Sequence, residues 1–290
     1  MIAPGRVVCV SFATADYYST LHELIESVKP YVDGYLAFYD TDLPSEFVTR
    51  NRRLFEDGRG FGYWVWKPYV ILEALERVED GDIVVYIDAG NLVIADLQPL
   101  VDLCAATSDG VLLFDNRDSN PDGDVWKNSM WTTADCFSFL DADSPLYTDG
   151  SQVDAAYLVL QKRPESVAFV RELLEACQRY ELLREPPSET GPELPGFVEH
   201  RWDQSILSIL AIRHGVTRAR EPSQDGNRAI GPDDTYGQVF DHHRGRFRIA
   251  RDSREARRLL ARARRRARAR RLLGRPKEIR WLTPPEADDD

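Results

Sequence analysis

The residue best placed for chemistry in this sequence is Asp88, which follows the apolar run Ile83–Ile87 and precedes Ala89 and Gly90. An apolar run of this length, bounded by polar and turn residues, predicts a strand that is buried on both faces of a parallel sheet. Ligands of open α/β sheets bind beyond the carboxyl ends of such strands. Asp88 is therefore a candidate ligand-binding or catalytic carboxylate. The alternative is that Asp88 only caps the turn that follows it.

A second segment, residues 59–68, combines two glycines, four aromatic residues and Lys67 just before a predicted helix. Glycines let the backbone approach a ligand, and the aromatic faces of Trp64 and Trp66 can stack on a base or a sugar. Lys67 can meet a phosphate beside the partly positive helix N-terminus. This combination suits a nucleotide sugar. The alternative for either tryptophan is an aromatic cluster that closes the core under a loop.

A third segment places Asp203 at the predicted start of a helix, directly after His200, Arg201 and Trp202. N-capping alone would account for Asp203. However, His200 and Arg201 add groups that can bind or protonate a substrate, and a helix start holds its side chains rigidly.

A fourth polar cluster contains Asp241, His242 and His243. Adjacent histidines on a strand point to opposite faces, so at most one of them is expected to enter a site. Together with Asp88, that histidine would form an oxygen-and-imidazole site for Mn²⁺ or Mg²⁺ bound to a diphosphate.

The elements that must position these residues alternate between strand and helix in the first half of the chain. This alternation predicts an α/β fold with a largely parallel central sheet, right-handed crossovers and helices on its faces. The predicted strands are 7–12, 34–39, the run before Asp88, 110–114 and 155–160, and the predicted helices are 17–28, 44–55, 68–78, 96–106, 132–140, 164–183 and 203–214.

Charge divides the chain into an acidic body and a basic tail. Residues 244–280 contain 17 Lys and Arg against 3 Asp and Glu, although the whole chain carries a net charge of −11. The Ala, Leu and Arg content of residues 254–273 predicts a basic helix with a narrow apolar stripe. We therefore expect a domain over 1–250 and a basic helical tail with an acidic terminus over 251–290.

The basic tail has two interpretations that the sequence leaves open. One is a solvated helix that packs against the acidic body. The other is electrostatic attachment to an anionic membrane, at about 1 kcal/mol per basic residue near the surface. The acidic body argues against nucleic acid as the main partner. No apolar stretch approaches the roughly 18 residues that span a bilayer. We expect a cytoplasmic protein, which under the second interpretation of the tail is peripheral on the inner face of the membrane.

Five motifs occur in an order that resembles a known family. The series Gly62–Pro68, Tyr86–Gly90, Trp131–Asp135, His200–Ser205 and His242–Arg244 is similar to a broad group of bacterial glycosyltransferases with the GT-A fold, many of them encoded among genes for surface polysaccharides. The resemblance covers roughly residues 6–248, and the ordered series is more specific than any single motif.

The resemblance implies roles for particular residues. Asp203 and Asp88 would be catalytic, with Asp203 as the base for the acceptor hydroxyl. The implied donor-binding residues are Ser11, Trp64, Trp66, Lys67, Asp88, Ala89 and Gly90. The implied sugar or acceptor contacts are Trp131, Asp135, Gln152, His200 and Gln204, and the implied metal ligands are Asp88, His242 and His243.

The chain departs from the family at one position that bears on the cofactor. Such enzymes carry an Asp-x-Asp pair for the ribose and a divalent metal, whereas here Asp88 is followed by Ala89 and Gly90. Either Asp88 and a C-terminal histidine hold Mn²⁺ or Mg²⁺ with the diphosphate, or lysine and arginine side chains neutralise the leaving group instead.

The resemblance implies a hexosyltransferase-like enzyme that transfers a sugar from a nucleotide-sugar donor. We expect the donor to be UDP-linked. The acceptor would be a hydroxyl of a glycan, a lipid-linked molecule or a small molecule. Two alternatives use the same donor site. A nucleotide-sugar hydrolase or phosphotransferase would place water where the acceptor belongs, and a non-catalytic nucleotide-sugar-binding protein would bind without turnover.

Overall fold

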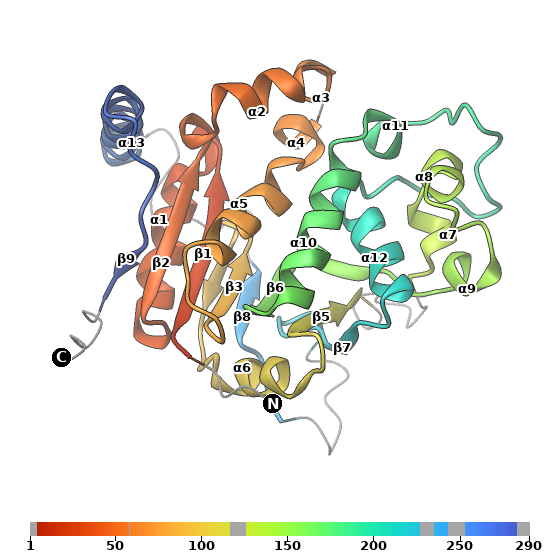
Figure 1. Ribbon diagram of the computed structural model, residues 1–290, viewed down its shortest axis with the longest axis horizontal. Helices are drawn as coiled ribbons and strands as arrows, with labels where there is room; N and C mark the ends of the chain where they lie inside the picture. The colour runs from red at the N-terminus through yellow and green to blue at the C-terminus, as the bar shows by residue number, and fades with distance from the viewer. Residues whose placement is uncertain (1–4, 58, 117–125, 227–234, 243–252, 283–290) are drawn as a thin grey trace.

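A seven-stranded sheet forms the centre of the computed structural model, which describes residues 5–57, 59–116, 126–226, 235–242 and 253–282 (Figure 1). The strand order is β7-β5-β6-β3-β1-β2-β9. Five of these strands run in one direction, and β6 and β9 run against them. The strands are β1 (Val7–Ala13), β2 (Gly34–Tyr39), β3 (Ile83–Ile87), β5 (Val111–Asp115), β6 (Val153–Gln161), β7 (Thr217–Arg220) and β9 (Arg280–Trp281).

The central strands are buried on both faces, which explains their continuous apolar sequences. Every residue of β1 and β3 is buried. Successive side chains of a strand point to opposite faces, so Val8 and Val10 enter one apolar core while Val7 and Cys9 enter the other. The sheet thus separates two cores.

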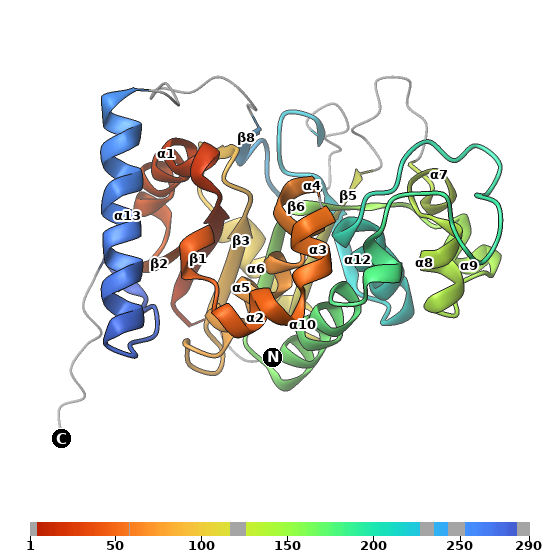
Figure 2. The same cartoon turned by 90° about the horizontal axis from the view of Figure 1, so that it is seen from above.

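Helices cover both faces of the sheet (Figures 1 and 2). One core receives side chains from α5 (Trp66–Leu75), α10 (Pro164–Cys177) and α12 (Asp203–Arg213), and the other from α1 (Tyr18–Val28) and α6 (Gln98–Ala106). The predicted α/β fold with a mostly parallel central sheet between layers of helices is confirmed.

Shorter helices complete the chain, and two predicted long helices are each divided. The segment predicted as 44–55 forms two helices because Asn51 leaves helical geometry and its side-chain amide donates to the carbonyl of Phe47. The segment predicted as 164–183 divides after Cys177. The remaining short helices are α2 (Ser45–Arg50), α3 (Arg52–Asp57), α4 (Arg59–Tyr63), α7 (Asn128–Trp131), α8 (Ala134–Phe139), α9 (Pro145–Thr148) and α11 (Tyr180–Leu183).

The basic segment forms a 19-residue helix, α13 (Arg254–Leu272), as predicted. It lies beside α1 at the β2 side of the sheet, opposite α7, α8 and α9 (Figure 2). Beyond it, β9 pairs with β2 in antiparallel orientation. A division of the chain at residue 250 stays a prediction.

A small second sheet pairs β4 (Asn91–Val93) with β8 (Phe240–His242). This pairing brings the late polar cluster of the sequence next to the turn after Asp88. Within the described ranges, no helix combines the length and the apolar character that crossing a bilayer requires.

Candidate active site

The candidate site is a pocket of about 850 Å³ at the sheet edge where β3 ends. Because β6 runs against β3, the beginning of β6 lies at the same edge, and the Asp88 amide donates to the carbonyl of Ala156 at 2.9 Å. The residues named in the sequence analysis that line the pocket are Trp64, Lys67, Asp88, Arg201, Trp202, Asp203, Gln204, Asp241 and His242.

Lys67 joins the two predicted catalytic carboxylates. Its Nζ lies 2.9 Å from Oδ2 of Asp203 and 3.5 Å from Oδ1 of Asp88, and it also donates to the carbonyl of Ala155 at 3.0 Å. The Lys67 and Asp203 side chains are only 6% and 8% exposed, whereas that of Asp88 is 25% exposed. Lys67 comes from the first turn of α5 and Asp203 from the first residue of α12, so two helix starts hold the pair rigidly.

Burial and pairing act in opposite directions on the pKa values of this cluster. Burial raises the pKa of Asp203 to about 6 and the charge of Asp88 adds to this, although Lys67 opposes both. Burial would lower the pKa of Lys67, but the attraction of Asp203 and Asp88 raises it overall. Lys67 is therefore a permanent cation at neutral pH, and Asp203 exchanges its proton close to that range.

Asp88 is held by its neighbours and still faces the pocket. The Tyr86 hydroxyl donates to its Oδ1 at 2.5 Å, and the side-chain amide of Asn91 donates to its carbonyl at 2.9 Å. The side chains of Tyr86, before the predicted turn, and Asn91, after it, thus both hydrogen-bond to Asp88. Ala89 and Gly90 supply the turn and do not line the pocket.

The glycines of the aromatic segment are needed for its backbone geometry. Gly60 and Gly62 have φ values of +62° and +86°, and an added Cβ at Gly60 would lie 2.5 Å from the ring of Trp64. Trp64, itself at positive φ, packs against Trp202 with ring centroids 5.0 Å apart. The guanidinium of Arg59 lies 4.8 Å from the Trp202 ring, so this wall of the pocket combines aromatic faces with a cation.

Trp66 does not join that wall. It is buried and stacks on Phe12 with ring centroids 3.9 Å apart, which is the core-closing arrangement that the sequence left as the alternative. Ser11 on β1 is fully buried and lies outside the pocket lining as well. Neither side chain lines the pocket.

A second aromatic cluster contributes to the lining of the pocket. Trp126 stacks on Trp131 at 4.5 Å, and the guanidinium of Arg201 lies 4.8 Å from the Trp131 ring and 5.5 Å from that of Trp126. Trp126 and Arg201 line the pocket, while Trp131 supports them from behind. Sequence reasoning had given Trp131 the contact and missed Trp126.

Two predicted contact residues instead hold neighbouring loops. Asp135 pairs with Arg184 and accepts backbone hydrogen bonds from Glu189 and Thr190 at 2.9 and 2.8 Å. His200 is buried between the carbonyl of Leu182 and the amide of Thr133, and burial lowers its pKa to about 4. A neutral, fully enclosed imidazole cannot serve the pocket as an acid.

Gln152 lies one layer behind the pocket. Its side-chain oxygen accepts from Gln204 at 3.2 Å, and its amide donates to Asn128 at 2.9 Å. Gln152 therefore orients Gln204, which faces the pocket, and is a positioning residue.

Asp154 is a pocket carboxylate that the sequence reading missed. It lies near the start of β6, accepts from the Ala156 amide at 2.7 Å, and has a pKa raised by burial. His242 opposes that shift and Asp88 adds to it. The signal was an aspartate inside an apolar run, but the strand had been predicted to begin only at Ala155.

The metal ligands predicted from the sequence are of the right types for a hard cation. Asp88 and His242 line one pocket, and His243 lies outside the described residues. Among the residues the structure describes, no set of three or more His, Cys, Asp or Glu side chains converges as an ion-binding group. A metal ion at this position would need further oxygen ligands from a molecule bound in the pocket.

Comparison with known proteins gives structural neighbours only. No protein-family model matches the chain, and no curated protein matches it. Similar solved structures include apo WbbM, a bifunctional glycosyltransferase, at 14% identity over 77% of this chain and 40% of that chain, with a TM-score of 0.44. The galactosyltransferase LgtC, in complex with donor and acceptor sugar analogues, matches at 15% identity over 96% of this chain and 98% of that chain, with a TM-score of 0.41.

A third neighbour is the apo form of the glycosyltransferase GlyE from Streptococcus pneumoniae TIGR4. It matches at 15% identity over 89% of this chain and 60% of that chain, with a TM-score of 0.39. The chain spans less than half the length of WbbM and nearly all of LgtC. All three TM-scores lie below 0.5, so the function is argued from the residues of the pocket.

Proposed function

We propose that this protein is a glycosyltransferase of the GT-A type that moves a hexose from a UDP-linked donor to a hydroxyl of a glycan, lipid-linked or small-molecule acceptor. The observation that carries the proposal is the buried Lys67 that bridges Asp88 and Asp203 at the floor of the pocket. The pocket volume of about 850 Å³ lies in the range of roughly 300–1,000 Å³ that is usual for small-molecule sites.

Different residues of the pocket lining suit different parts of the donor. Trp64 and Trp126 offer faces on which a base or a sugar can stack. Arg59 and Arg201 offer guanidinium groups that suit a diphosphate. Asp88, a partly exposed carboxylate at the strand end, would accept the ribose hydroxyls or hold a metal ion.

The transfer step assigns the base to Asp203. The bond between the anomeric carbon and the diphosphate oxygen breaks with its electron pair on the diphosphate. The acceptor oxygen bonds to the anomeric carbon, and its proton passes to the Asp203 carboxylate. A pKa of about 6 leaves this carboxylate unprotonated at neutral pH and basic enough to help. In a retaining enzyme, Asp203 would instead anchor the acceptor.

The leaving diphosphate must meet positive charge in either case. A divalent metal, Mn²⁺ or Mg²⁺, would be held by Asp88 and His242 together with donor oxygens, and would neutralise the developing charge when bound. The side chains of Arg59 and Arg201 are the alternative source of that charge. A lipid-linked acceptor would place the protein at a membrane, where exposed arginines of α13, such as Arg257 and Arg258, could meet anionic lipid.

The test is ligand-dependent thermal stabilisation by UDP, GDP, CMP and dTDP and their sugars, each with Mn²⁺ or EDTA. We expect a shift for one nucleotide in wild type, its loss in Asp88→Ala, and its retention in Asp143→Ala, an exposed aspartate outside the pocket. A shift that EDTA leaves unchanged would assign the charge to the arginines. No shift with any nucleotide would overturn the proposal.

A second measurement separates transfer from its alternatives. With the stabilising donor and a panel of acceptors, donor consumption is compared with glycoside formation in wild type and Asp203→Asn. Transfer that exceeds hydrolysis in wild type supports a transferase. Donor cleavage without a glycoside product would indicate a hydrolase, and binding without any turnover would indicate a non-catalytic binding protein.

A further inference from the structure

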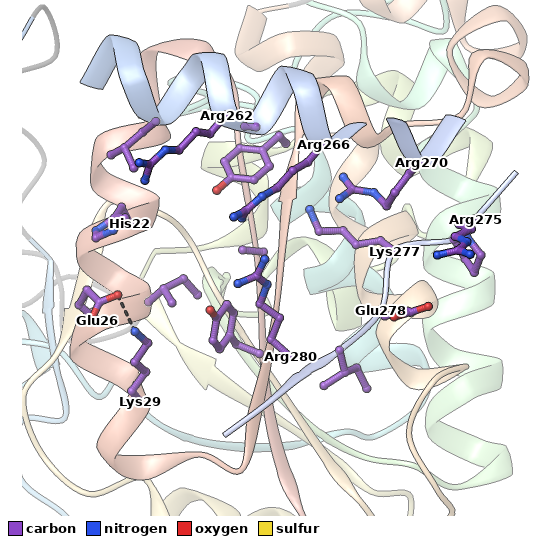
Figure 3. Close-up of a pocket in the computed structure, with 18 residues that line it drawn as sticks. His22, Glu26, Lys29, Arg262, Arg266, Arg270, Arg275, Lys277, Glu278 and Arg280 are labelled. Carbon is purple, nitrogen blue, oxygen red and sulfur yellow. Dashed lines mark hydrogen bonds and ion pairs between the residues drawn. The ribbon is translucent and has the colours of Figure 1, made fainter. Parts of the chain in front are cut away.

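A second pocket, of about 550 Å³, lies between α13, α1, β2 and the segment that leads into β9 (Figure 3). It shares no lining residue with the candidate active site. Its walls come from the beginning and the end of the chain, because α13 packs against α1 and the turn after β2. Three arginines of α13 point from the helix toward the pocket in Figure 3, namely Arg262, Arg266 and Arg270.

Positive side chains dominate this pocket. Seven lysines and arginines line it, against the two glutamates Glu26 and Glu278. Lys29 directly follows α1, and the six cations from the C-terminal segment are Arg262, Arg266, Arg270, Arg275, Lys277 and Arg280.

The acidic groups nearby neutralise only part of this charge. Asp42, whose side chain is 3% exposed, pairs with both Arg270 and Lys277. Glu26 pairs with Lys29 at 2.6 Å. In the described part of the chain, the guanidinium groups of Arg262, Arg266 and Arg275 have no carboxylate within ion-pair distance.

Lys277 shows how closely the positive side chains of this pocket are crowded. Burial lowers the pKa of Lys277 to about 8, and although Asp42 opposes this shift, Arg270 and Arg280 add to it. The Lys277 ammonium also lies 4.8 Å from the ring of Tyr39, which is a weak substitute for an anion. Crowded like charges of this kind persist at a cost in stability unless a ligand relieves them.

The spacing of the arginines limits which anions could contact all three of them. Arg262, Arg266 and Arg270 follow at intervals of four residues on one face of α13, so neighbours are separated by about 6 Å along the helix. Guanidinium groups bind phosphate oxygens in a bidentate fork. A single phosphate would reach one or two of these side chains, and only a longer anion would reach all three.

We propose that this pocket binds a polyanion that carries two or more phosphate groups. Its phosphates would lie along the row formed by Arg262, Arg266 and Arg270, with Arg275 and Arg280 on the opposite side. The same chemistry is offered by a soluble phosphorylated molecule and by the headgroup of an anionic lipid, and the test has an arm for each source.

The probes are inorganic tripolyphosphate and vesicles of phosphatidylglycerol in phosphatidylcholine, each used with the full chain. The pocket variant is Arg262→Gln with Arg266→Gln, since neither guanidinium holds Asp42. The matched control is Arg264→Gln with Arg268→Gln, because these exposed arginines belong to the same helix but do not line the pocket. Both variants lose two positive charges, and thermal unfolding without ligand verifies that both are folded.

We expect calorimetry to show tripolyphosphate binding to wild type and to the control, and binding weaker by roughly tenfold or more in the pocket variant. If all three proteins bind equally, or none binds, the proposal is overturned. Vesicle binding lost only in the pocket variant would make the source a lipid headgroup. Vesicle binding that does not differ between the two variants, with tripolyphosphate binding still lost only in the pocket variant, would make it a soluble anion.

Discussion

At the scale of single residues, the site depends on how one lysine shares its charge between two carboxylates. Lys67 lies 2.9 Å from Asp203 and 3.5 Å from Asp88, and the Lys67 and Asp203 side chains are nearly buried, whereas that of Asp88 is 25% exposed. Removing either partner of such a buried pair leaves an unpaired charge, which is more costly than the pair itself is stabilising. This allows catalysis and stability to be tested with the same variants.

Activity should rise with pH through about 6 and then level off, because the proposed base must be unprotonated and the pKa of Asp203 is about 6. In Asp203→Asn we expect the rate of transfer to fall by roughly 10²–10⁴-fold, with nucleotide affinity kept within a few-fold. The measurement is the pH dependence of kcat/KM, with Asp143→Asn as the control. A profile in Asp203→Asn that still rises through pH 6 would assign the titration to another group.

Lys67→Met should destabilise the protein by about 3–5 kcal/mol at pH 7. The loss should be smaller at pH 5: Lys67 opposes the upward pKa shift of Asp203, so without it the carboxylate binds its proton more readily and becomes neutral at acidic pH. Urea unfolding at both pH values measures the effect. The double variant Lys67→Met with Asp203→Leu should recover part of the loss, and no recovery would mean that the unpaired carboxylate is not its cause.

The position of a residue relative to its helix or strand explains which site residues could be predicted. Asp88, Lys67 and Asp203 stand at the ends of elements whose periodicity is visible in the sequence, so their positions followed from the pattern. Asp135 and His200 have the same chemical types but are buried against backbone groups contributed by distant loops. Nothing local to the sequence separates a polar side chain that binds backbone from one that binds substrate.

At the scale of elements, left-handed backbone that runs from α4 into the residue after it brings Trp64 to the pocket. Phe61, Tyr63 and Trp64 adopt positive φ values together with Gly60 and Gly62, and each such non-glycine residue costs of order 1 kcal/mol or more. The sequence identified the glycines as points of close approach. It could not show that the aromatic residues share this conformation, because surrounding packing imposes it.

Gly60→Ala should weaken donor binding more than it weakens the fold. The new methyl group would meet the Trp64 ring at 2.5 Å in a backbone conformation with φ of +62°, so the ring must move out of the pocket wall. We expect at least tenfold weaker nucleotide-sugar binding by calorimetry. Gly191→Ala is the matched control, since an added Cβ there meets nothing within 4 Å, and equal affinities in the two variants would contradict the assignment of Trp64.

At the scale of the whole molecule, the strand directions were the least predictable feature. The apolar runs gave the strands, but β6 returns against β3 and thereby carries Asp154 to the same edge as Asp88. The connection before β6 runs through the small helices α7, α8 and α9, and its path depends on packing between segments far apart in the chain. The pairing of β9 with β2 is unpredictable for the same reason.

Deletion of residues 251–290 tests whether residues 1–250 form an independent domain. Without α13 and β9, the nearly buried Asp42 loses its ion pairs with Arg270 and Lys277. On the side away from β1, β2 also loses its pairing with β9. We expect a lower Tm and a partial recovery by Asp42→Asn in the shortened chain, measured by thermal unfolding. An unchanged Tm would show that the catalytic domain is independent of the tail.

The two-residue strand β9 has a consequence for how molecules of this protein meet one another. An open sheet presents unpaired backbone groups at its outer strands, and these can recruit another chain into aggregates. Here β9 pairs with Gly34 and Tyr35 at the start of β2, and the opposite outer strand, β7, is four residues long and carries Arg218 and Arg220. Neither side of the sheet offers a long, uncharged template, so concentrated solutions of the protein should resist growth of intermolecular β-structure.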